Sequence, residues 1–508
     1  MRIAIINKKR IAASEWQKGQ NRHQNQGGRK ANSAGFSSRD ACTVLQAEPS
    51  STVMTSTTSL PIKRSRASFF LNPAHAHTLR ANFAWNAAGI IVFSLSQWGV
   101  LAVFAKLGTP ALVGQIVYGL ALTTPLFVIA SLQLRQIQAT DTDNRHRLGQ
   151  YLGLRIFTTG AALIVALIFS CMTWTTGAQL ALIVMLLALS KTFDAGSDVL
   201  YGLFQRVERM DYVGISLILR SLLAFVSVVA LLRASRSVPI ALAGMVVSWG
   251  AVFMLFDIPV TRNLIRRREQ QARASDTISE LLRPIFARRQ LAPLCLKAAP
   301  LGVVAFLFAV QAQVPRYVIA GLLNTHELGL FSAAAYITFI GTALVNALGA
   351  PASVRLAQNY IAGERSSFNQ LMTKLLLIAG ALGIAGILVS AFAGSRILAL
   401  LYTNDYSRMA GVLTMLCAAS ALSYAASFLG YGMTALRRYK VQVPIFLGVV
   451  LITLISCYWL TGRYGMMGTA AGVLVGNLGQ LLMSASVVLR TKWPDRGFVR
   501  TDARATAA

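Results

Sequence analysis

Long apolar runs alternate with short polar segments along most of the chain. From residue 83 onward the apolar runs reach the length of about 20 residues that a helix needs to cross a membrane. Gly, Ala, Ser and Thr are interspersed in them, as in GALGIAGILVSAFAG from Gly380, and such small residues let helices pack closely in lipid. The pattern predicts an all-α integral membrane fold with twelve transmembrane helices, at residues 83–105, 111–134, 151–173, 178–203, 212–232, 239–261, 293–320, 328–352, 371–393, 408–433, 441–460 and 465–489.

The Lys and Arg residues between these runs indicate how the helices are oriented. When the N-terminus is placed inside, most of them fall in the connections on the cytoplasmic side, including the basic stretch from Arg262 to Gln290. Cytoplasmic connections of membrane proteins carry an excess of Lys and Arg. We therefore expect a multi-pass protein of the bacterial cytoplasmic (inner) membrane with both termini in the cytoplasm.

The stretch from Arg262 to Gln290 divides the predicted spans into two sets of six. LGTPALVG (Leu107 to Gly114) joins the first two spans of one set, and LNTHELG (Leu323 to Gly329) occupies the same place in the other. Because six spans return the chain to its starting side, both halves have one orientation. We expect two six-helix lobes related by a parallel pseudo-two-fold axis along the membrane normal, with substrate binding between them.

Composition supports a membrane protein and argues against a nucleic-acid binder. Only 13% of the residues are charged and 55% are hydrophobic, whereas a soluble domain carries about 25% charged residues. The net charge of +30 comes mostly from the N-terminal tail and the connections between spans. The five Cys and five His residues form no metal-ligand pattern, so we expect no metal and no cofactor.

The first 80 residues differ in composition from the rest. They are rich in Gln, Asn, Gly and Arg and have too few apolar residues to build a core. We expect a disordered basic tail at 1–80, with Met54 as an alternative start. The predicted parts that follow are an N-terminal lobe (81–261), a basic cytoplasmic connector (262–292), a C-terminal lobe (293–490) and a cytoplasmic tail (491–508).

Several charged residues interrupt the apolar spans. A charge near the middle of a span costs about 2.5–3.5 kcal/mol on insertion scales, so these side chains should face a wet interior or one another. At 3.6 residues per turn, Lys191, Asp194 and Asp198 share one helical stripe. One interpretation is structural, with Lys191 neutralising an aspartate, and the other is a polar transport site. The cations are Arg155, Lys191, Arg220, Lys297 and Arg316, and the acids are Asp194, Asp198 and Asp257.

Three stretches resemble a known family of membrane proteins. DVLYGLFQRVERMDYVGISLILRSLL from Asp198, VPRYVIAGLLNTHELGLFSAAAYITFIGTAL from Val314 and PASVRLAQNYIAG from Pro351 are similar to Wzx-type polysaccharide exporters. These exporters belong to the multidrug/oligosaccharidyl-lipid/polysaccharide (MOP) superfamily. The resemblance extends over roughly residues 82–494 as a diffuse pattern of small and apolar positions. It implies a MATE-like fold and alternating access.

The resemblance also implies a cargo and partners. The cargo would be an undecaprenyl-pyrophosphate-linked oligosaccharide, moved to the outer leaflet for O-antigen, capsule or exopolysaccharide synthesis. Twelve spans rather than fourteen favour these cargoes over a peptidoglycan precursor. Membrane lipid, a polysaccharide polymerase and glycosyltransferases of the same pathway would be partners.

A pyrophosphate cargo gives the cations in the spans a role. Lys and Arg offer an anionic headgroup replacement solvation. Arg220, about 12 Å inside its span, and Lys191, deeper still, are the best candidates. Arg155, Lys297 and Arg316 lie nearer span ends, where reaching out to the interface is the stronger explanation.

Other assignments remain open at this point. Asp194, Asp198 and Asp257 fit either a coupling proton or sodium ion or a structural ion pair. Tyr402, Tyr406 and other aromatic residues at span ends fit membrane anchors better than sugar-stacking groups. The main alternative function is a cation-coupled multidrug antiporter of the same superfamily. A polysaccharide polymerase or ligase is less consistent with the short outer loops, and GxxxxGK[ST] is absent. We expect a transporter rather than an enzyme.

Overall fold

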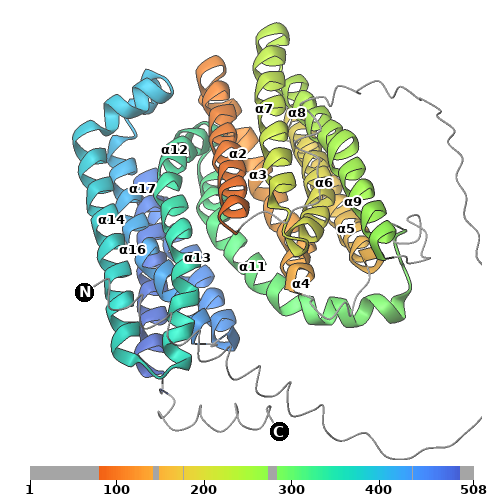
Figure 1. Ribbon diagram of the computed structural model, residues 1–508. Coiled ribbons are helices and arrows are strands. Elements are labelled where there is room, and N and C mark those ends of the chain that lie inside the picture. The colour runs from red at the N-terminus through yellow and green to blue at the C-terminus, as the bar shows by residue number, and fades with distance from the viewer. Residues whose placement is uncertain are drawn as a thin grey trace, which may run out of the picture. The chain divides into compact units, whose positions relative to one another are not determined.

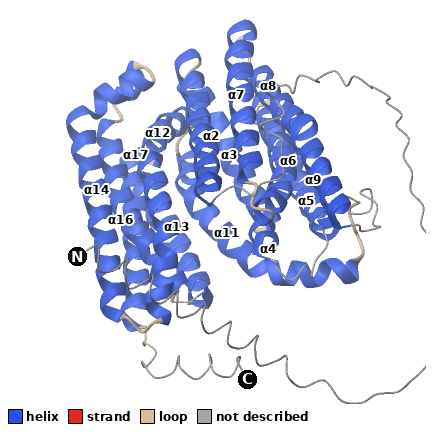
Figure 2. Ribbon diagram, viewed as in Figure 1, coloured by secondary structure: helices blue, strands red, loops and turns tan. Residues whose placement is uncertain are grey.

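Every regular element that the computed structural model describes is helical (Figure 2). The described residues are 79–140, 148–175, 177–272, 283–436, 439–491 and 493. The expected N-terminal tail lies outside these ranges except for its last two residues, and so does most of the predicted C-terminal tail. Within the described ranges, eleven helices are long and apolar enough to cross a membrane. The predicted all-α membrane fold is confirmed.

The helices, drawn in Figure 1, cover the predicted spans, although several extend beyond the predicted ends and the predicted span 328–352 is divided between two helices. In chain order they are α2 (Leu79–Leu107), α3 (Pro110–Ser131), α4 (Leu134–Thr140), α5 (Leu148–Trp174), α6 (Ala178–Arg206), α7 (Met210–Ser235), α8 (Val238–Val252), the π-helix η2 (Phe253–Asp257), α9 (Ile258–Ala272), α11 (Arg288–Leu322), α12 (Thr325–Ile337), α13 (Phe339–Ile361), α14 (Arg365–Leu401), α15 (Asn404–Ser407), α16 (Ala410–Ala435) and α17 (Tyr439–Arg490).

Helix α17 contains the last two predicted spans. Gly465 has φ 56° and ψ −138°, so the chain leaves the helical conformation there, and glycine is the residue that adopts positive φ without a steric cost. The two arms fold back on each other, because the Thr461 and Thr469 hydroxyl groups lie 2.7 Å apart and Ser456 Oγ donates to the Gly472 carbonyl at 3.0 Å. The arms match the predicted runs 441–460 and 465–489. A total of twelve membrane crossings stays a prediction.

The helices form two groups that meet through α3, α11 and α12. In the first group α2 packs on α7, α7 on α8, and α6 on α3, α4, α5 and α8; in the second, α16 packs on α13, α14 and α17. Helix α3 contacts both α11 and α12, and α11 also contacts α17. A buried apolar core that includes Phe104, Ile319 and Leu328 extends through this junction.

The starts of α3 and α12 pack directly against each other. Thr109 and Asn324 cap the two helices, their side-chain oxygens accepting hydrogen bonds from the N–H groups of Leu112 and Glu327. A Cβ atom at Gly114 would overlap the Thr325 carbonyl oxygen, and one at Gly329 would overlap that of Pro110. The two segments that the sequence pairs by similarity are therefore in contact, and this close approach requires glycine on both sides.

The expected connector at 262–292 is helical at both ends. Helix α9 continues to Ala272, and α11 begins at Arg288. Both helices therefore extend beyond their apolar parts into the polar residues of the connector. Between them, the Ile285 N–H donates to the Gly149 carbonyl at 2.9 Å. The described residues just before α11 thus pack against the start of α5, a contact that the basic composition of this stretch does not predict.

Candidate functional site

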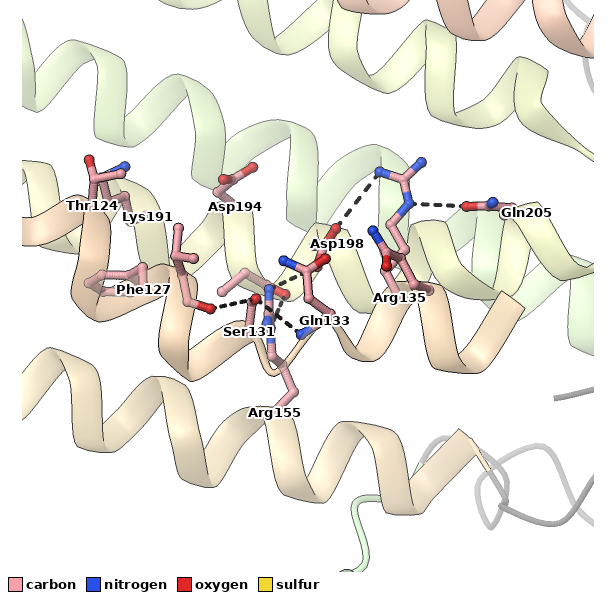
Figure 3. A pocket seen from close by; sticks show the side chains of 13 residues that line it. Thr124, Phe127, Ser131, Gln133, Arg135, Arg155, Lys191, Asp194, Asp198 and Gln205 are labelled. Atoms are coloured by element: carbon pink, nitrogen blue, oxygen red, sulfur yellow. Dashed lines mark hydrogen bonds and ion pairs between the residues drawn. The ribbon is translucent and has the colours of Figure 1, made fainter. Parts of the chain in front are cut away.

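A polar cavity of about 460 Å³ lies within the first helix group, among α3, α4, α5 and α6 (Figure 3). Four of the eight predicted site residues line it, namely Arg155, Lys191, Asp194 and Asp198. The other lining residues are Thr124, Phe127, Val128, Ser131, Gln133, Arg135, Gln136, Ala195 and Gln205. The stripe that the sequence predicts on α6 therefore faces a common cavity.

Arg155 is fixed in the wall of this cavity. Its Nε donates to the Ala195 carbonyl at 2.9 Å, and its Nη2 lies 3.0 Å from Asp198 Oδ2. The Arg155 side chain is only 7% exposed. Reaching out to the membrane interface, the stronger explanation from sequence, does not describe this residue. It instead neutralises a carboxylate on the neighbouring helix.

Asp194 forms an ion pair with Arg220 rather than with Lys191. The Arg220 Nη1 lies 2.7 Å from Asp194 Oδ1, and the Arg220 side chain is 3% exposed. Its guanidinium carbon lies 4.7 Å from the ring centroid of Trp249 and 5.3 Å from that of Phe93, within the range of favourable cation–π contact. Arg220 is not among the residues that line the cavity, so it supports Asp194 from outside the cavity wall.

Lys191 lines the cavity without a fixed partner. No described residue forms an ion pair or a hydrogen bond with its ammonium group. Arg135, Arg155 and Lys191 are the cationic lining residues, and Asp194 and Asp198 are the anionic ones. Asp194 is paired with Arg220, and Asp198 with both Arg155 and Arg135. Among the described lining residues, Lys191 is therefore the cation that forms no ion pair, and its charge is available to an anion.

Asp257 is buried outside this cavity. It is the last residue of η2 and is fully buried, and Ser197 Oγ donates to its Oδ2 at 2.6 Å. Among the described residues its Oδ1 has no hydrogen-bond partner. A π-helical turn inside an α-helical span is rare and occurs often at functional sites. Here it turns the Asp257 carboxylate toward α6.

Arg316 and Lys297 lie on α11, apart from the other predicted site residues. The Arg316 Nη1 donates to Gln313 Oε1 at 2.5 Å, and its guanidinium carbon lies 5.6 Å from the Tyr336 ring centroid. Lys297 is exposed. Neither residue lines the cavity, so the structure brings together part of the predicted cation set and leaves these two outside it.

The aromatic residues at one junction of the two helix groups are buried. Tyr402 and Tyr406 are 2% and 0% exposed, whereas membrane anchors contact the lipid headgroups. The Trp98 indole N–H donates to Tyr402 Oη at 3.2 Å, and Tyr402 Oη donates to the Ala333 carbonyl at 3.1 Å. The interpretation of these two tyrosines as membrane anchors is therefore wrong.

Sequence reasoning missed the cavity residues that follow α3. Arg135 directly follows the predicted span 111–134 and was not among the predicted site residues, but its Nε donates to Gln205 Oε1 at 3.3 Å and its Nη1 lies 3.8 Å from Asp198. Gln133 lines the same region. The available signal was LQLRQIQ from Leu132, in which three glutamines and an arginine are interspersed with apolar residues.

Comparisons with known proteins agree with this fold and with the family that the sequence suggests. The chain is 24% identical over 401 residues to the capsular polysaccharide biosynthesis protein CapF of Staphylococcus aureus, covering 79% of this chain and 97% of that one. The lipid II flippase MurJ in an inward closed conformation is similar in structure, with a TM-score of 0.59, 11% identity and coverage of 83% of this chain and 90% of MurJ.

A second solved structure defines the fold class. An inward-facing multidrug resistance MATE family transporter of the MOP superfamily gives a TM-score of 0.57 at 14% identity, covering 86% of this chain and 97% of the transporter. The fold is therefore that of the MATE-like, MOP-type membrane proteins. A family model described as polysaccharide biosynthesis protein matches residues 79–357, and the chain belongs to this family.

Proposed function

We propose that the chain is a flippase for lipid-linked oligosaccharides. In this proposal it moves a polyprenyl-pyrophosphate-linked repeat unit from the inner to the outer leaflet of the cytoplasmic membrane by alternating access. Family membership and the similarity to a capsular polysaccharide biosynthesis protein support a role in polysaccharide assembly. The fold shared with a lipid II flippase and a MATE transporter supports transport as the activity.

The unpaired ammonium group of Lys191 is the observation that carries the proposal. A charge taken out of water needs an opposite charge or hydrogen-bond partners, and the described residues around Lys191 provide neither ion pair nor hydrogen bond. A pyrophosphate group carries at least two negative charges and accepts hydrogen bonds only. It therefore fits the part of the cavity in which the Lys191 ammonium group can donate hydrogen bonds to a bound anion.

The multidrug antiporter is supported less well by the same residues. A cationic drug needs a free carboxylate, but Asp194 and Asp198 each lie within 3.0 Å of an arginine. We infer that these two pairs, and the Asp257–Ser197 contact, are structural elements of the first helix group. Under the proposal both termini are cytoplasmic, and polymerase and glycosyltransferases of the same pathway act on the carried lipid.

The proposal is tested by removing the unpaired charge. In proteoliposomes containing the full chain, we expect Lys191→Ala to reduce the transbilayer movement of a fluorescent polyprenyl-diphospho-sugar at least tenfold. Loss of a charge-assisted hydrogen bond worth about 1.5–3 kcal/mol produces an effect of this size. Lys191→Arg should retain most of the rate, because it keeps the charge.

Lys374→Ala is the matched control, since Lys374 is an exposed lysine of α14 outside the cavity. It should move the lipid at the wild-type rate. Wild-type movement by Lys191→Ala, at equal protein per vesicle, would contradict the proposed role of the cavity.

A further inference from the structure

The turn between α3 and α4 has an unusual backbone conformation. Leu132 and Gln133 have φ values of 46° and 52°, and the left-handed conformation costs a residue with a side chain about 1–2 kcal/mol. Neither residue is glycine or asparagine, which adopt this conformation most readily. Strained backbone persists where the surroundings enforce it, and it is concentrated at functional sites.

The surroundings of this turn do enforce its conformation. Ser131 Oγ donates to the Val128 carbonyl at 2.7 Å and accepts from the Gln133 N–H at 3.3 Å. The Leu132 side chain is 8% exposed and belongs to an apolar cluster with Leu134 and Leu294. With Leu132 buried on one side, the turn directs the next residue, Gln133, to the cavity (Figure 3).

Gln133 adds an unused amide group to the cavity lining. No described residue forms a hydrogen bond with this amide. Two residues further along the chain, Arg135 contacts Gln205 and Asp198, and its guanidinium carbon lies 5.5 Å from the ring centroid of Tyr201. This end of the cavity therefore combines amide and guanidinium donors with amide and carboxylate acceptors.

A mixed set of donors and acceptors suits a hydroxyl-bearing ligand better than a phosphate. Phosphate oxygens only accept hydrogen bonds and cannot donate to the oxygens of Asp198 and Gln205, whereas a sugar hydroxyl both donates and accepts. Asp198 lies about 10 Å from Lys191 along the axis of α6. A sugar attached to a diphosphate at Lys191 would lie at this level.

Resting on the proposed function, we propose that Gln133, Arg135 and Gln205 form a sugar subsite next to the Lys191 headgroup site. It takes the sugar ring that is bonded to the diphosphate. Gln133 is the specificity residue of this subsite, and the strained turn at Leu132 holds it in position.

The subsite is tested by binding two probes to the purified full chain in lipid nanodiscs. The probes are farnesyl diphosphate and farnesyl diphosphoglucose. The wild-type protein should bind the sugar-bearing probe more tightly. Gln133→Gly should reduce affinity for that probe about tenfold, the upper range for one hydrogen bond, and leave affinity for farnesyl diphosphate unchanged.

Two further variants, Gln133→Asn and Lys191→Ala, show whether a loss of affinity comes from the Gln133 amide, from the backbone of the turn or from the headgroup site. Asparagine also relieves the backbone strain but keeps an amide, so it should retain part of the preference for the sugar-bearing probe. Lys191→Ala should weaken both probes equally. Equal affinities of the wild-type protein for both probes, an unchanged preference in Gln133→Gly, or an equal loss of both probes in that variant would each overturn the sugar subsite. If Lys191→Ala alone binds both probes normally, the headgroup assignment fails instead.

Discussion

Asp194 and Asp198 lie one helical turn apart on α6, and each is paired with an arginine from a different helix. Arg220 of α7 contacts Asp194 at 2.7 Å, and Arg155 of α5 contacts Asp198 at 3.0 Å. These pairs explain how the span tolerates two acids, since opposite charges reduce the cost of each in a low dielectric. Lys191, on the same stripe, forms no ion pair with a described residue.

The Arg220–Asp194 pair is expected to stabilise the fold. Arg220→Met leaves Asp194 without its partner, and breaking a buried pair costs about 3–5 kcal/mol. We expect a smaller loss than that range, because the Asp194 side chain is 43% exposed and its charge remains in contact with water. Thermal unfolding of the full chain in nanodiscs measures the effect.

The double variant Arg220→Met with Asp194→Leu should recover most of the lost stability, since no charge is left unpaired. An Arg220→Met protein that unfolds at the wild-type temperature would show that the pair is not structural.

The sequence predicts which residues carry charge in the spans but not how they pair. The spacing of Lys191, Asp194 and Asp198 follows from helical periodicity alone, and the cavity confirms their common face. Their arginine partners depend on how α5 and α7 are rotated against α6, which no local pattern encodes. Gln133 was missed because no glycine or proline marks the turn after α3.

The positions of the apolar spans along the chain are the part of the fold that the sequence predicts best. Each span needs about 20 apolar residues, so polar segments mark its ends, and the predicted break between 460 and 465 coincides with Gly465. The helical ends of the connector at Ala272 and Arg288 were not predicted, because they are basic rather than apolar.

The contact between α3 and α12 should depend on the size of two residues. Gly329→Val places a side chain against the Pro110 carbonyl, so the two helices must separate. Val113 is fully buried on α3. We expect a cysteine introduced there by Val113→Cys to react faster with a water-soluble maleimide in the Gly329→Val background than in the wild-type background.

Gly380→Val is the matched change on α14, where a Cβ atom meets no other atom within 4 Å. It should leave the labelling rate of the Val113→Cys protein unchanged. Equal rates in the Gly329→Val and Gly380→Val backgrounds would mean that the glycine contact does not hold α3 and α12 together.

At the scale of the whole molecule, the location of the unpaired charge separates the candidate functions. The fold is shared with proteins described as a multidrug transporter and as a lipid II flippase, so the fold does not decide the cargo. Within the described cavity both carboxylates are neutralised by arginine and Lys191 is not. This distribution favours an anionic cargo.

A direct comparison of two cargoes tests this claim. Proteoliposomes containing the wild-type full chain are supplied either with a fluorescent polyprenyl-diphospho-sugar or with ethidium, an organic cation, and movement across the bilayer is followed over time. We predict that the protein accelerates movement of the diphosphate-linked lipid and leaves that of ethidium at the rate of protein-free vesicles. Accelerated ethidium movement without movement of the diphosphate-linked lipid would contradict the account.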